Sequence, residues 1–545
     1  MLSRLVLLSA LLVFRVGQTK DIQECEQISH QNYECRDIEN FEQLSQYIQE
    51  DWQSVNVVNE HTGIENDDKL LPKLSKLLQL DLSQSGGLTL GRYGFRNFAS
   101  LQRLNLTHCQ LEELRSKHFA DNASLVNLDV SYNDLLLIER ALMRQLPNLV
   151  YANFSNNLIA NVEFDAFKGL KYLESLDLNT NEQENITLGS NANLRYLSIS
   201  NNNVRDFHWC RLRGLPQLQE LHLHSNWLEV LDMGIFYALS QLRVLNVSNN
   251  NIYEIQRNLF VGPAPDVDPL LRVLDYSSNN VKALEDYVFS RLHHLETLNL
   301  WFNQISKVSP TAFRGLTELQ SLQLQGNKIV QLPDKVFANL TALQVLDLRK
   351  NNIRQLGANV FVGFVLRNLS FLDLSNNNID QLHPLAFSSL PFLQELRLRR
   401  NKLTSLDIRM FAPLRRLRVL TLSENRLMEI EADLLSTFDK LTELQINNNQ
   451  LTYLPVLEEQ LLSQLRHISI EGNPWQCLCL DELTNWLHAR LVSYATIASA
   501  YYKGRKPLCI VTPKEQCVRD LEAVCELGIV ESFEQIGGGK GAINQ

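Results

Sequence analysis

Apolar residues recur along most of this chain with a period of 24 residues. Each period begins with the spacing L-x-x-L-x-L-x-x-N-x-L, as in the segment from Leu319 to Ile329. The first positions of the 17 segments are residues 77, 101, 125, 149, 173, 194, 218, 242, 271, 295, 319, 343, 369, 393, 417, 441 and 465. Thirteen of the 16 intervals are 24 residues, and the exceptions are 21 (173 to 194), 29 (242 to 271) and 26 (343 to 369). Self-similarity at a fixed period indicates a repeat architecture.

The L-x-L centre of each repeat alternates between apolar and polar positions, which predicts a short strand with one buried face. Stacked strands would form one parallel sheet over a continuous interior, where each covered leucine contributes about 1.5–3 kcal/mol. An asparagine recurs at position nine from Asn133 to Asn473, and Cys109 replaces it in one repeat. Because its amide both donates and accepts, it can satisfy backbone groups where the chain leaves the strand.

A second apolar ladder lies six residues before the repeat starts. Its members are Phe95, Phe119, Phe167, Phe236, Phe289, Phe313, Phe337, Phe387 and Phe411. We expect these rings to fill the convex side. Strands spaced about 4.8 Å apart take up less length than the convex segments, so the stack must curve. The sequence therefore predicts an α/β repeat, a curved solenoid of about 17 repeats with a parallel concave sheet.

The chain begins with a feature typical of secretion. Arg4 precedes an apolar run from Leu5 to Phe14, which is too short to span a bilayer but suits the core of a signal peptide. A membrane-anchored N-terminus is the alternative, and it would need a longer run. No other segment reaches the roughly 18 apolar residues of a membrane span. We therefore expect a secreted, extracellular protein whose leader is residues 1–19.

Seven of the nine cysteines lie near the two ends: Cys25, Cys35, Cys477, Cys479, Cys509, Cys517 and Cys525. A secreted chain can oxidise them, and the open ends of a solenoid need covering because they expose core leucines. We therefore expect disulfide-stapled caps at both ends. Cys109 and Cys210 lie within the repeats and are expected to be buried thiols rather than reactive ones.

This pattern resembles the extracellular leucine-rich-repeat family, which includes Toll-type receptor ectodomains, slit-like guidance proteins and insect adhesion proteins. The resemblance extends roughly over residues 20–525. It implies an N-terminal cap over residues 20–76, a solenoid over 77–472 and a cysteine-rich C-terminal cap over 473–525. A flexible polar tail, residues 526–545, would follow.

The resemblance also implies how the caps are bonded. The C-x-C pair of the family's C-terminal cap joins two later cysteines, which here gives Cys477–Cys509 and Cys479–Cys525 and leaves Cys517 over. A zinc site is the alternative interpretation of C-x-C. Cys25 and Cys35 suit the N-terminal cap, although the family usually has four cysteines there. Trp52, Val55 and Val57 are expected to form a strand of that cap.

Outward-facing strand positions line the predicted concave face, where such proteins usually bind. Many are Ser, Asn, Gln or Thr, and an aromatic pair with a set of cations stands out among them: Trp301, Phe302, Arg349, Lys350, Arg397, Arg399, Arg400 and Arg418. Trp301, Arg349 and Arg399 share position seven at intervals of two repeats, about 10 Å. An aromatic pair beside an arginine-rich stripe has the composition of a binding hot spot for an acidic protein or sulfated glycan. The alternative is a solvated face whose charges Glu395 and Glu424 balance.

Glycosylation signals bear on which part of the face is open. Sequons start at Asn105, Asn122, Asn153, Asn185, Asn246, Asn339 and Asn368. Asn105, Asn153 and Asn246 occupy position five, so glycans there would obstruct the concave face in the N-terminal half. No repeat from Leu271 onward has a sequon at that position, which favours binding in the C-terminal half. The longest repeat holds the Pro-rich insertion 262–269, an expected surface loop.

Nothing in the sequence predicts catalysis or a cofactor. We find no G-x-S-x-G, no H-E-x-x-H and no grouped carboxylates, and His222 with His224 supplies only two ligands for a metal. The net charge of −10 disfavours nucleic acid as a partner. Two functions remain: a secreted, protein-binding recognition factor in signalling or innate immunity, or an adhesion or matrix component that binds acidic glycans. A homodimer would suit either.

Overall fold

The structure is a computed structural model. It describes residues 25–59, 64, 69–92, 94–185, 188–206, 212, 214–231, 237, 239–262, 267–362, 366–455, 461–494, 509–511 and 517. The predicted leader 1–19, Phe236, the core of the Pro-rich insertion, Cys210, Cys525 and the tail 526–545 lie outside the described residues. The chain divides into two compact units, residues 1–173 and 174–545.

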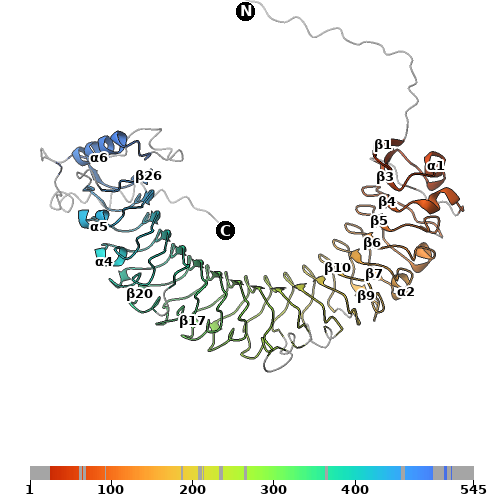
Figure 1. The fold of residues 1–545 in the computed structure, drawn as a ribbon, viewed down its shortest axis with the longest axis horizontal. Coiled ribbons are helices and arrows are strands. Elements are labelled where there is room, and N and C mark those ends of the chain that lie inside the picture. Colours follow the sequence, from red (N-terminus) through yellow and green to blue (C-terminus); the bar gives the residue numbers. More distant parts are fainter. Residues whose placement is uncertain are drawn as a thin grey trace, which may run out of the picture. The chain divides into compact units, whose positions relative to one another are not determined.

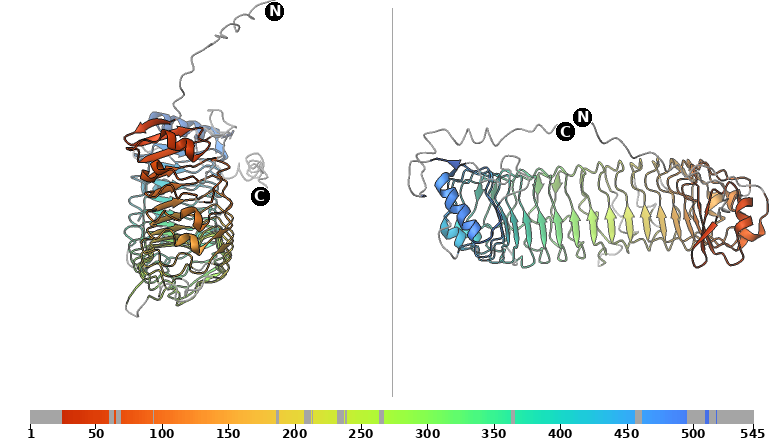
Figure 2. Two further views of the ribbon diagram at one scale, coloured as in Figure 1. Left: turned by 90° about the vertical axis from the view of Figure 1, so that its right-hand side faces the viewer. Right: turned by 90° about the horizontal axis from the view of Figure 1, so that it is seen from above.

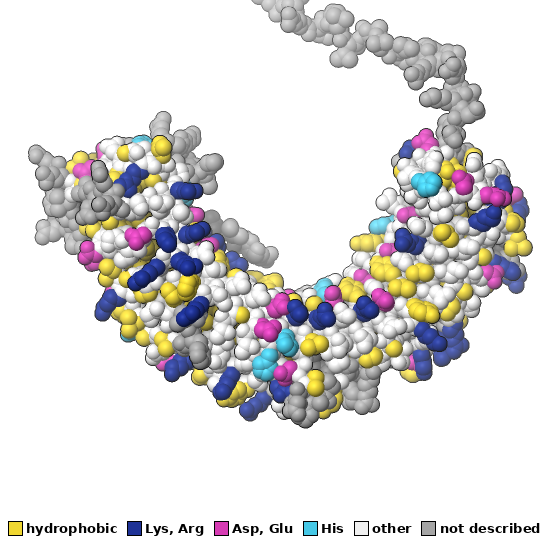
Figure 3. All heavy atoms as spheres, in the orientation of Figure 1, with side chains coloured by type: hydrophobic (Ala, Val, Ile, Leu, Met, Phe, Trp, Pro, Cys, Tyr) yellow, Lys and Arg dark blue, Asp and Glu magenta, His cyan; other side chains and the backbone are white. Residues whose placement is uncertain are grey.

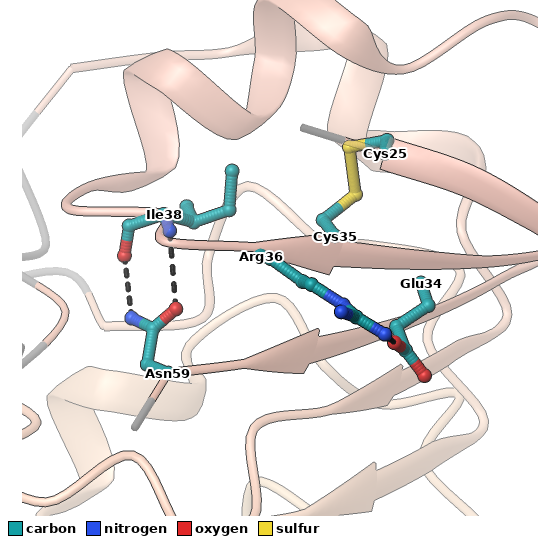
Figure 4. The surroundings of a disulfide bond; sticks show 6 residues. All are labelled: Cys25, Glu34, Cys35, Arg36, Ile38 and Asn59. Atoms are coloured by element: carbon teal, nitrogen blue, oxygen red, sulfur yellow. Dashed lines mark hydrogen bonds and ion pairs between the residues drawn. A yellow bond between two sulfur atoms is a disulfide. The ribbon is translucent and has the colours of Figure 1, made fainter. Parts of the chain in front are cut away.

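A hairpin and a helix cover the N-terminal end of the first unit. Strands β1 (Cys25–Ser29) and β2 (Asn32–Arg36) form an antiparallel hairpin that the Cys25–Cys35 disulfide closes, as predicted (Figure 4). Helix α1 (Phe41–Tyr47) follows, and the side chain of its N-cap residue Asn40 accepts from the backbone of Gln43. The Asn59 amide holds both backbone groups of Ile38, at 3.0 and 2.6 Å (Figure 4). Both backbone polar groups of Ile38 are thus satisfied.

Strand β3 (Ser54–Val58) joins this end to the repeats, because it pairs in parallel with both β2 and β4. Val55 and Val57 are buried in this strand, as predicted, whereas Trp52 lies before its first residue. The other elements of the first unit are η1 (Pro72–Lys76), β4 (Gln79–Asp81), β5 (Arg103–Asn105), η2 (Ser116–Phe119), β6 (Asn127–Asp129), β7 (Leu137–Ile138), α2 (Arg140–Met143), β8 (Tyr151–Asn153) and β9 (Asn161–Val162). Strands β4, β5, β6 and β8 are parallel neighbours, and β7 pairs with β9.

The second unit continues the pattern in a parallel sheet with unbroken register. Its strands are β10 (Ser175–Asp177), β11 (Tyr196–Ser198), β12 (Glu220–His222), β13 (Val244–Asn246), β14 (Val273–Asp275), β16 (Thr297–Asn299), β18 (Ser321–Gln323), β19 (Val345–Asp347), β21 (Phe371–Asp373), β23 (Glu395–Arg397), β24 (Val419–Thr421), β25 (Glu443–Gln445) and β26 (His467–Ser469). Equivalent leucines lie opposite one another, as Leu298 and Leu322 do.

Short pieces of regular structure lie away from this sheet. They are β15 (Ala283–Leu284) with β17 (Lys307–Val308), β20 (Gln355–Leu356) with β22 (Gln381–Leu382), α4 (Ile408–Phe411) and α5 (Ala432–Ser436). Within each unit the sheet lines the inner side of a curved stack (Figures 1 and 2). The predicted solenoid with a parallel concave sheet is therefore confirmed. No helix in the described parts of the chain is long and apolar enough to cross a membrane.

The convex side is filled by stacked phenylalanines, as the sequence predicts. Phe313 and Phe337 are nearly parallel with centroids 6.0 Å apart, and Phe337 and Phe361 are 5.7 Å apart. Phe361 and Phe438 also belong to this ladder. The prediction missed both, because neither lies six residues before the next repeat start.

The recurrent asparagines perform the predicted task. Asn327 donates from Nδ2 to the carbonyls of Leu300 and Leu324, both at 2.9 Å, and its Oδ1 accepts from the backbone of Ile305 at 3.0 Å. One side chain thus ties its own strand end to the preceding repeat. The Cys109 thiol, which stands at this position, donates to the carbonyl of Leu82 at 3.1 Å, and burial raises its pKa to about 12.

A conformational repeat accompanies the sequence repeat. Position eight has positive φ in all 17 repeats, whatever its residue type, as at Phe302 (52°), Lys350 (54°) and Arg400 (55°). This left-handed residue turns the chain off the strand and delivers the asparagine to the interior. It also separates positions seven and eight: only position seven continues the strand face, whereas position eight begins the turn.

The C-terminal end is closed by β27 (Trp475–Gln476), helix α6 (Cys477–Ala489) and β28 (Cys509–Ile510). The predicted Cys477–Cys509 disulfide is present. The pairing predicted between Cys479 and Cys525 is wrong, because Cys479 bonds to Cys517. Two cysteines two residues apart on a helix point to different sides, so each can take a different partner. Spacing in the sequence does not determine which later cysteine bonds to Cys479.

A candidate binding surface on the concave face

The sheet of the second unit places predicted site residues in aligned columns. Position five runs from Asp347 through Asp373 to Arg397 on three adjacent strands. Both aspartates are buried, and burial raises the pKa of Asp347 against the opposing effect of Arg349. The predicted basic stripe therefore lies over buried carboxylates that the prediction from the sequence did not include.

Each predicted strand arginine has a carboxylate partner. Arg349 Nε lies 3.0 Å from Asp347, and Arg397 lies 2.5 Å from Glu395. Arg399 and Arg400 share the two oxygens of Glu424. Burial raises the pKa of Glu424, but the hydrogen bonds from the two guanidinium groups outweigh it and hold that pKa below its usual value. The charges of this face are thus largely balanced within the protein, as the alternative interpretation of the sequence proposed.

An aromatic step lies at the other end of the predicted stripe. The rings of Trp301 and Phe302 meet edge to face at 5.3 Å, and Phe302 is 48% exposed. Lys350 Nζ lies 5.8 Å from the centroid of the Phe302 ring, a cation–π contact across two repeats. Lys350 has no carboxylate partner among the described residues, so it is the free cation of the predicted set on this side.

A hollow of about 470 Å³ connects the strands β19 to β25. It brings together the predicted residues Arg349, Arg397 and Arg399. The remaining charged groups of its lining are Asp373, Glu395 and Glu443, which sequence reasoning missed or used only as counter-charges. These carboxylates occupy positions three and five of their repeats, so the repeat alignment already placed them on the same face as the arginines. The hollow presents both signs of charge within a few ångströms.

Arg418 lies elsewhere. It occupies position two, before strand β24, and lines a different hollow of about 800 Å³ together with Lys440 and Arg466. Position two precedes the strand, so it belongs to the flank of the stack rather than to its concave face. The predicted eight-residue stripe is therefore two surfaces.

The sequons differ greatly in accessibility. Asn122 is completely buried, and its Nδ2 donates to the carbonyls of Phe95 and Phe98. Asn105 and Asn153 are half-buried on the concave face, and each donates from Nδ2 to an aspartate of the preceding repeat at 3.0 Å. These contacts occupy the atom to which a glycan would be attached. The exposed sequons are Asn185, Asn339 and Asn368.

Two other candidates from the sequence have plain structural roles. His222 lies 3.6 Å from Glu220 and packs near the Tyr196 ring, and within the described residues no group of three or more ligand side chains is placed to hold a metal ion. The end of the Pro-rich insertion is fixed to the next repeat, because Asp268 pairs with His293 at 2.6 Å and with Arg291 at 2.9 Å.

Comparison with known proteins agrees with this geometry. The leucine rich repeat family matches residues 123–182, 216–264, 269–329, 317–370 and 367–427. Toll-like receptor 3 of Bos taurus is 25% identical over 247 residues, which are 44% of this chain and 24% of the receptor. Toll-like receptor 3 of Boselaphus tragocamelus is 25% identical over 269 residues with the same coverage. The chain thus spans about a quarter of the length of the curated relatives it matches.

Solved structures share the fold over most of the chain. A repeat protein of Leptospira interrogans has a TM-score of 0.61 at 26% identity and covers 73% of this chain and 96% of that one. Toll in the Drosophila Toll–Spatzle complex has a TM-score of 0.61 at 17% identity, over 85% of this chain and 68% of that one. Its glycosylated form has a TM-score of 0.63 at 16% identity, over 90% and 70%. At such identities the Toll structures show a common fold alone.

Proposed function

Because this chain is a leucine-rich-repeat protein that resembles Toll-type ectodomains, we propose that it is a secreted recognition factor whose second unit binds a protein partner through its concave face. The repeat matches and the fold support protein binding in general. Its role in extracellular signalling or innate immunity is part of the proposal, and it rests on the resemblance to Toll-type proteins.

The observation that carries the proposal is the hollow lined by Arg349, Arg397 and Arg399 beside the exposed ring of Phe302. A protein partner brings carboxylates, cations and apolar side chains in a fixed arrangement. It can therefore exchange some of the internal ion pairs for intermolecular ones while it covers the aromatic step. A polyanion cannot, because every arginine that it engaged would leave a carboxylate of this face unpaired. Of the two partners predicted for this stripe, an acidic protein or a sulfated glycan, we therefore propose a protein.

Extracellular location fits the remaining features. The apolar run after Arg4, the disulfides at Cys25–Cys35 and Cys477–Cys509, and the exposed sequons all suit an oxidising, glycosylating route. The division into a leader (1–19), two caps (20–76 and 473–525), a solenoid (77–472) and a tail (526–545) is proposed on the same basis. An adhesion or matrix role, alone or as a homodimer, is the second candidate.

The test compares matched variants in a binding experiment. The purified chain is immobilised, exposed to extracellular fluid of the source organism, and the retained proteins are quantified by mass spectrometry. The variant Trp301→Ala with Phe302→Ala removes the aromatic step, while Trp227→Ala removes an exposed tryptophan of the same unit, at position ten and off the strand face. We expect a retained protein that the double variant loses by at least about tenfold and that Trp227→Ala keeps. Equal retention by all three forms would contradict the proposal.

A further inference from the structure

One flank of the second unit carries a cluster of cations that the concave face does not explain. Arg415, Arg416, Arg418, Lys440 and Arg466 are all exposed, and they lie just before strands β24 to β26. They occupy the last two positions of a repeat and position two of the next. Figure 3 shows Lys and Arg side chains gathered on this part of the unit, with few acidic ones between them.

These cations are unpaired, unlike those of the concave face. None of the five forms an ion pair with a carboxylate of the described chain, whereas Arg349, Arg397, Arg399 and Arg400 all do. The hollow of about 800 Å³ that Arg418, Lys440 and Arg466 line contains two carboxylates, Asp439 and Glu443. Glu443 already accepts from Gln445 Nε2 at 2.6 Å. The flank therefore has an excess of positive charge although the whole chain is acidic.

The cations also follow the axis of the stack. Arg416 and Lys440 occupy the same position in adjacent repeats, about 5 Å apart at the backbone. Arg418 and Arg466 share position two at an interval of two repeats, about 10 Å. Strand spacing thus sets positive charges in rows, and a ligand with negative charges repeated along a line fits such rows.

We propose that this flank binds a linear sulfated glycan. Sulfate esters stay ionised at all physiological pH values, and arginine guanidinium groups meet such oxyanions through paired N–H donors. The site is separate from the proposed protein-binding face, and it does not depend on that proposal.

An acidic protein fits this flank less well. Protein interfaces need buried aromatic or aliphatic anchors at their centre. Among the described residues from Leu385 onward, the large exposed hydrophobic side chains are Leu385, Met428, Leu478, Leu491 and Val511, and none occupies the repeat positions that carry the cations. The aromatic ring beside the cluster, Phe392, is covered by the Arg416 guanidinium at 4.4 Å. Single-stranded nucleic acid needs exposed rings on which its bases stack, and these positions present none.

The experiment measures binding of a fluorescent heparin octasaccharide to the full chain at graded salt. The flank variant carries Arg418→Ala, Lys440→Ala and Arg466→Ala. The matched control carries Arg349→Ala, Lys350→Ala and Arg399→Ala, so both lose three positive charges. All six side chains are exposed or partly exposed, and circular dichroism verifies that each variant is folded. Asp439→Asn removes a negative charge from the flank, so its change in net charge is opposite in sign to that of the two triple variants.

We expect the flank variant to weaken binding by at least about tenfold. The slope of log affinity against log salt should become less steep by about 3, because binding releases about one counterion fewer for each contact that is lost. The concave control should retain the affinity, Asp439→Asn should increase it, and fully desulfated heparin should not bind. Equal losses in both triple variants, or full binding of desulfated heparin, would overturn the proposal. So would an RNA of equal charge that binds the same flank more tightly than heparin does.

Discussion

The ring of Phe302 lies directly against the α-carbon of Gly326, one repeat further along the stack. A Cβ added at Gly326 would stand 2.4 Å from Phe302 Cδ1, and the glycine has a φ of +71°. Its lack of a side chain is what allows the Phe302 ring to extend toward Lys350.

Gly326→Ala therefore tests how the aromatic step is built. The new methyl group displaces the Phe302 ring, and the positive φ adds about 1 kcal/mol of backbone strain. We expect a lower urea midpoint and a change in the near-ultraviolet signal of Trp301 and Phe302. Gly357→Ala is the matched control, because its Cβ would meet nothing closer than 3.8 Å. An unchanged aromatic signal in Gly326→Ala would show that the ring does not depend on the glycine.

The asparagine ladder predicts a strong effect of one buried amide. Asn327→Leu removes three buried hydrogen bonds and leaves the backbone N–H of Ile305 without a partner, while the carbonyls of Leu300 and Leu324 each lose one of two donors. We expect a loss of about 2–4 kcal/mol in the free energy of unfolding, measured by urea denaturation. Asn352→Leu changes an exposed asparagine one repeat later and should cost less than about 0.5 kcal/mol. Similar losses in the two variants would refute the role assigned to the ladder.

Glycan occupancy should follow burial rather than the sequon alone. Asn122 is completely buried and bonded, so we expect it to be unmodified in the folded protein. Asn339 is exposed and should carry a glycan, and so should Asn368, which is exposed although its Nδ2 donates to the carbonyl of Thr341 at 3.0 Å. Peptide mapping after enzymatic deglycosylation in heavy-oxygen water reads the three sites in one experiment. A glycan on Asn122 would be incompatible with the packing described for this repeat.

His118 predicts a pH dependence of stability. Burial lowers its pKa to about 4, with a smaller contribution from Lys117 and an opposing one from Glu113. Between the ordinary histidine pKa of about 6.5 and this value, the unfolded chain binds a proton that the folded chain does not. Stability therefore falls as pH falls through this window, and from pH 7 to pH 5 the loss should be about 1–2 kcal/mol.

The measurement is the urea midpoint at pH 7 and pH 5 for three forms. His118→Gln should reduce the difference between the two pH values by the contribution of this group. His30→Gln changes an exposed histidine and should leave the difference as it is in the wild type. If the wild type and His118→Gln respond equally to pH, the histidine does not contribute.

The sequence by itself determined the repeat, the sheet and the two ladders. These follow from local periodicity, because a leucine at position four and an asparagine at position nine have the same neighbours in every repeat. The disulfide Cys477–Cys509 followed from the family resemblance. The leucines of the core, such as Leu298 and Leu322, are all where the pattern placed them.

Only the tertiary structure decided which charged groups are free. Arg399 and Arg400 both pair with Glu424, which belongs to the next repeat. Arg418 and Arg466, in contrast, face solvent. The left-handed residue at position eight and the choice of Cys517 as the partner of Cys479 are likewise not contained in the spacing. The physical reason is that ion pairs and disulfides depend on side-chain directions and distances between repeats, whereas hydrophobic periodicity records only which face of each repeat is buried.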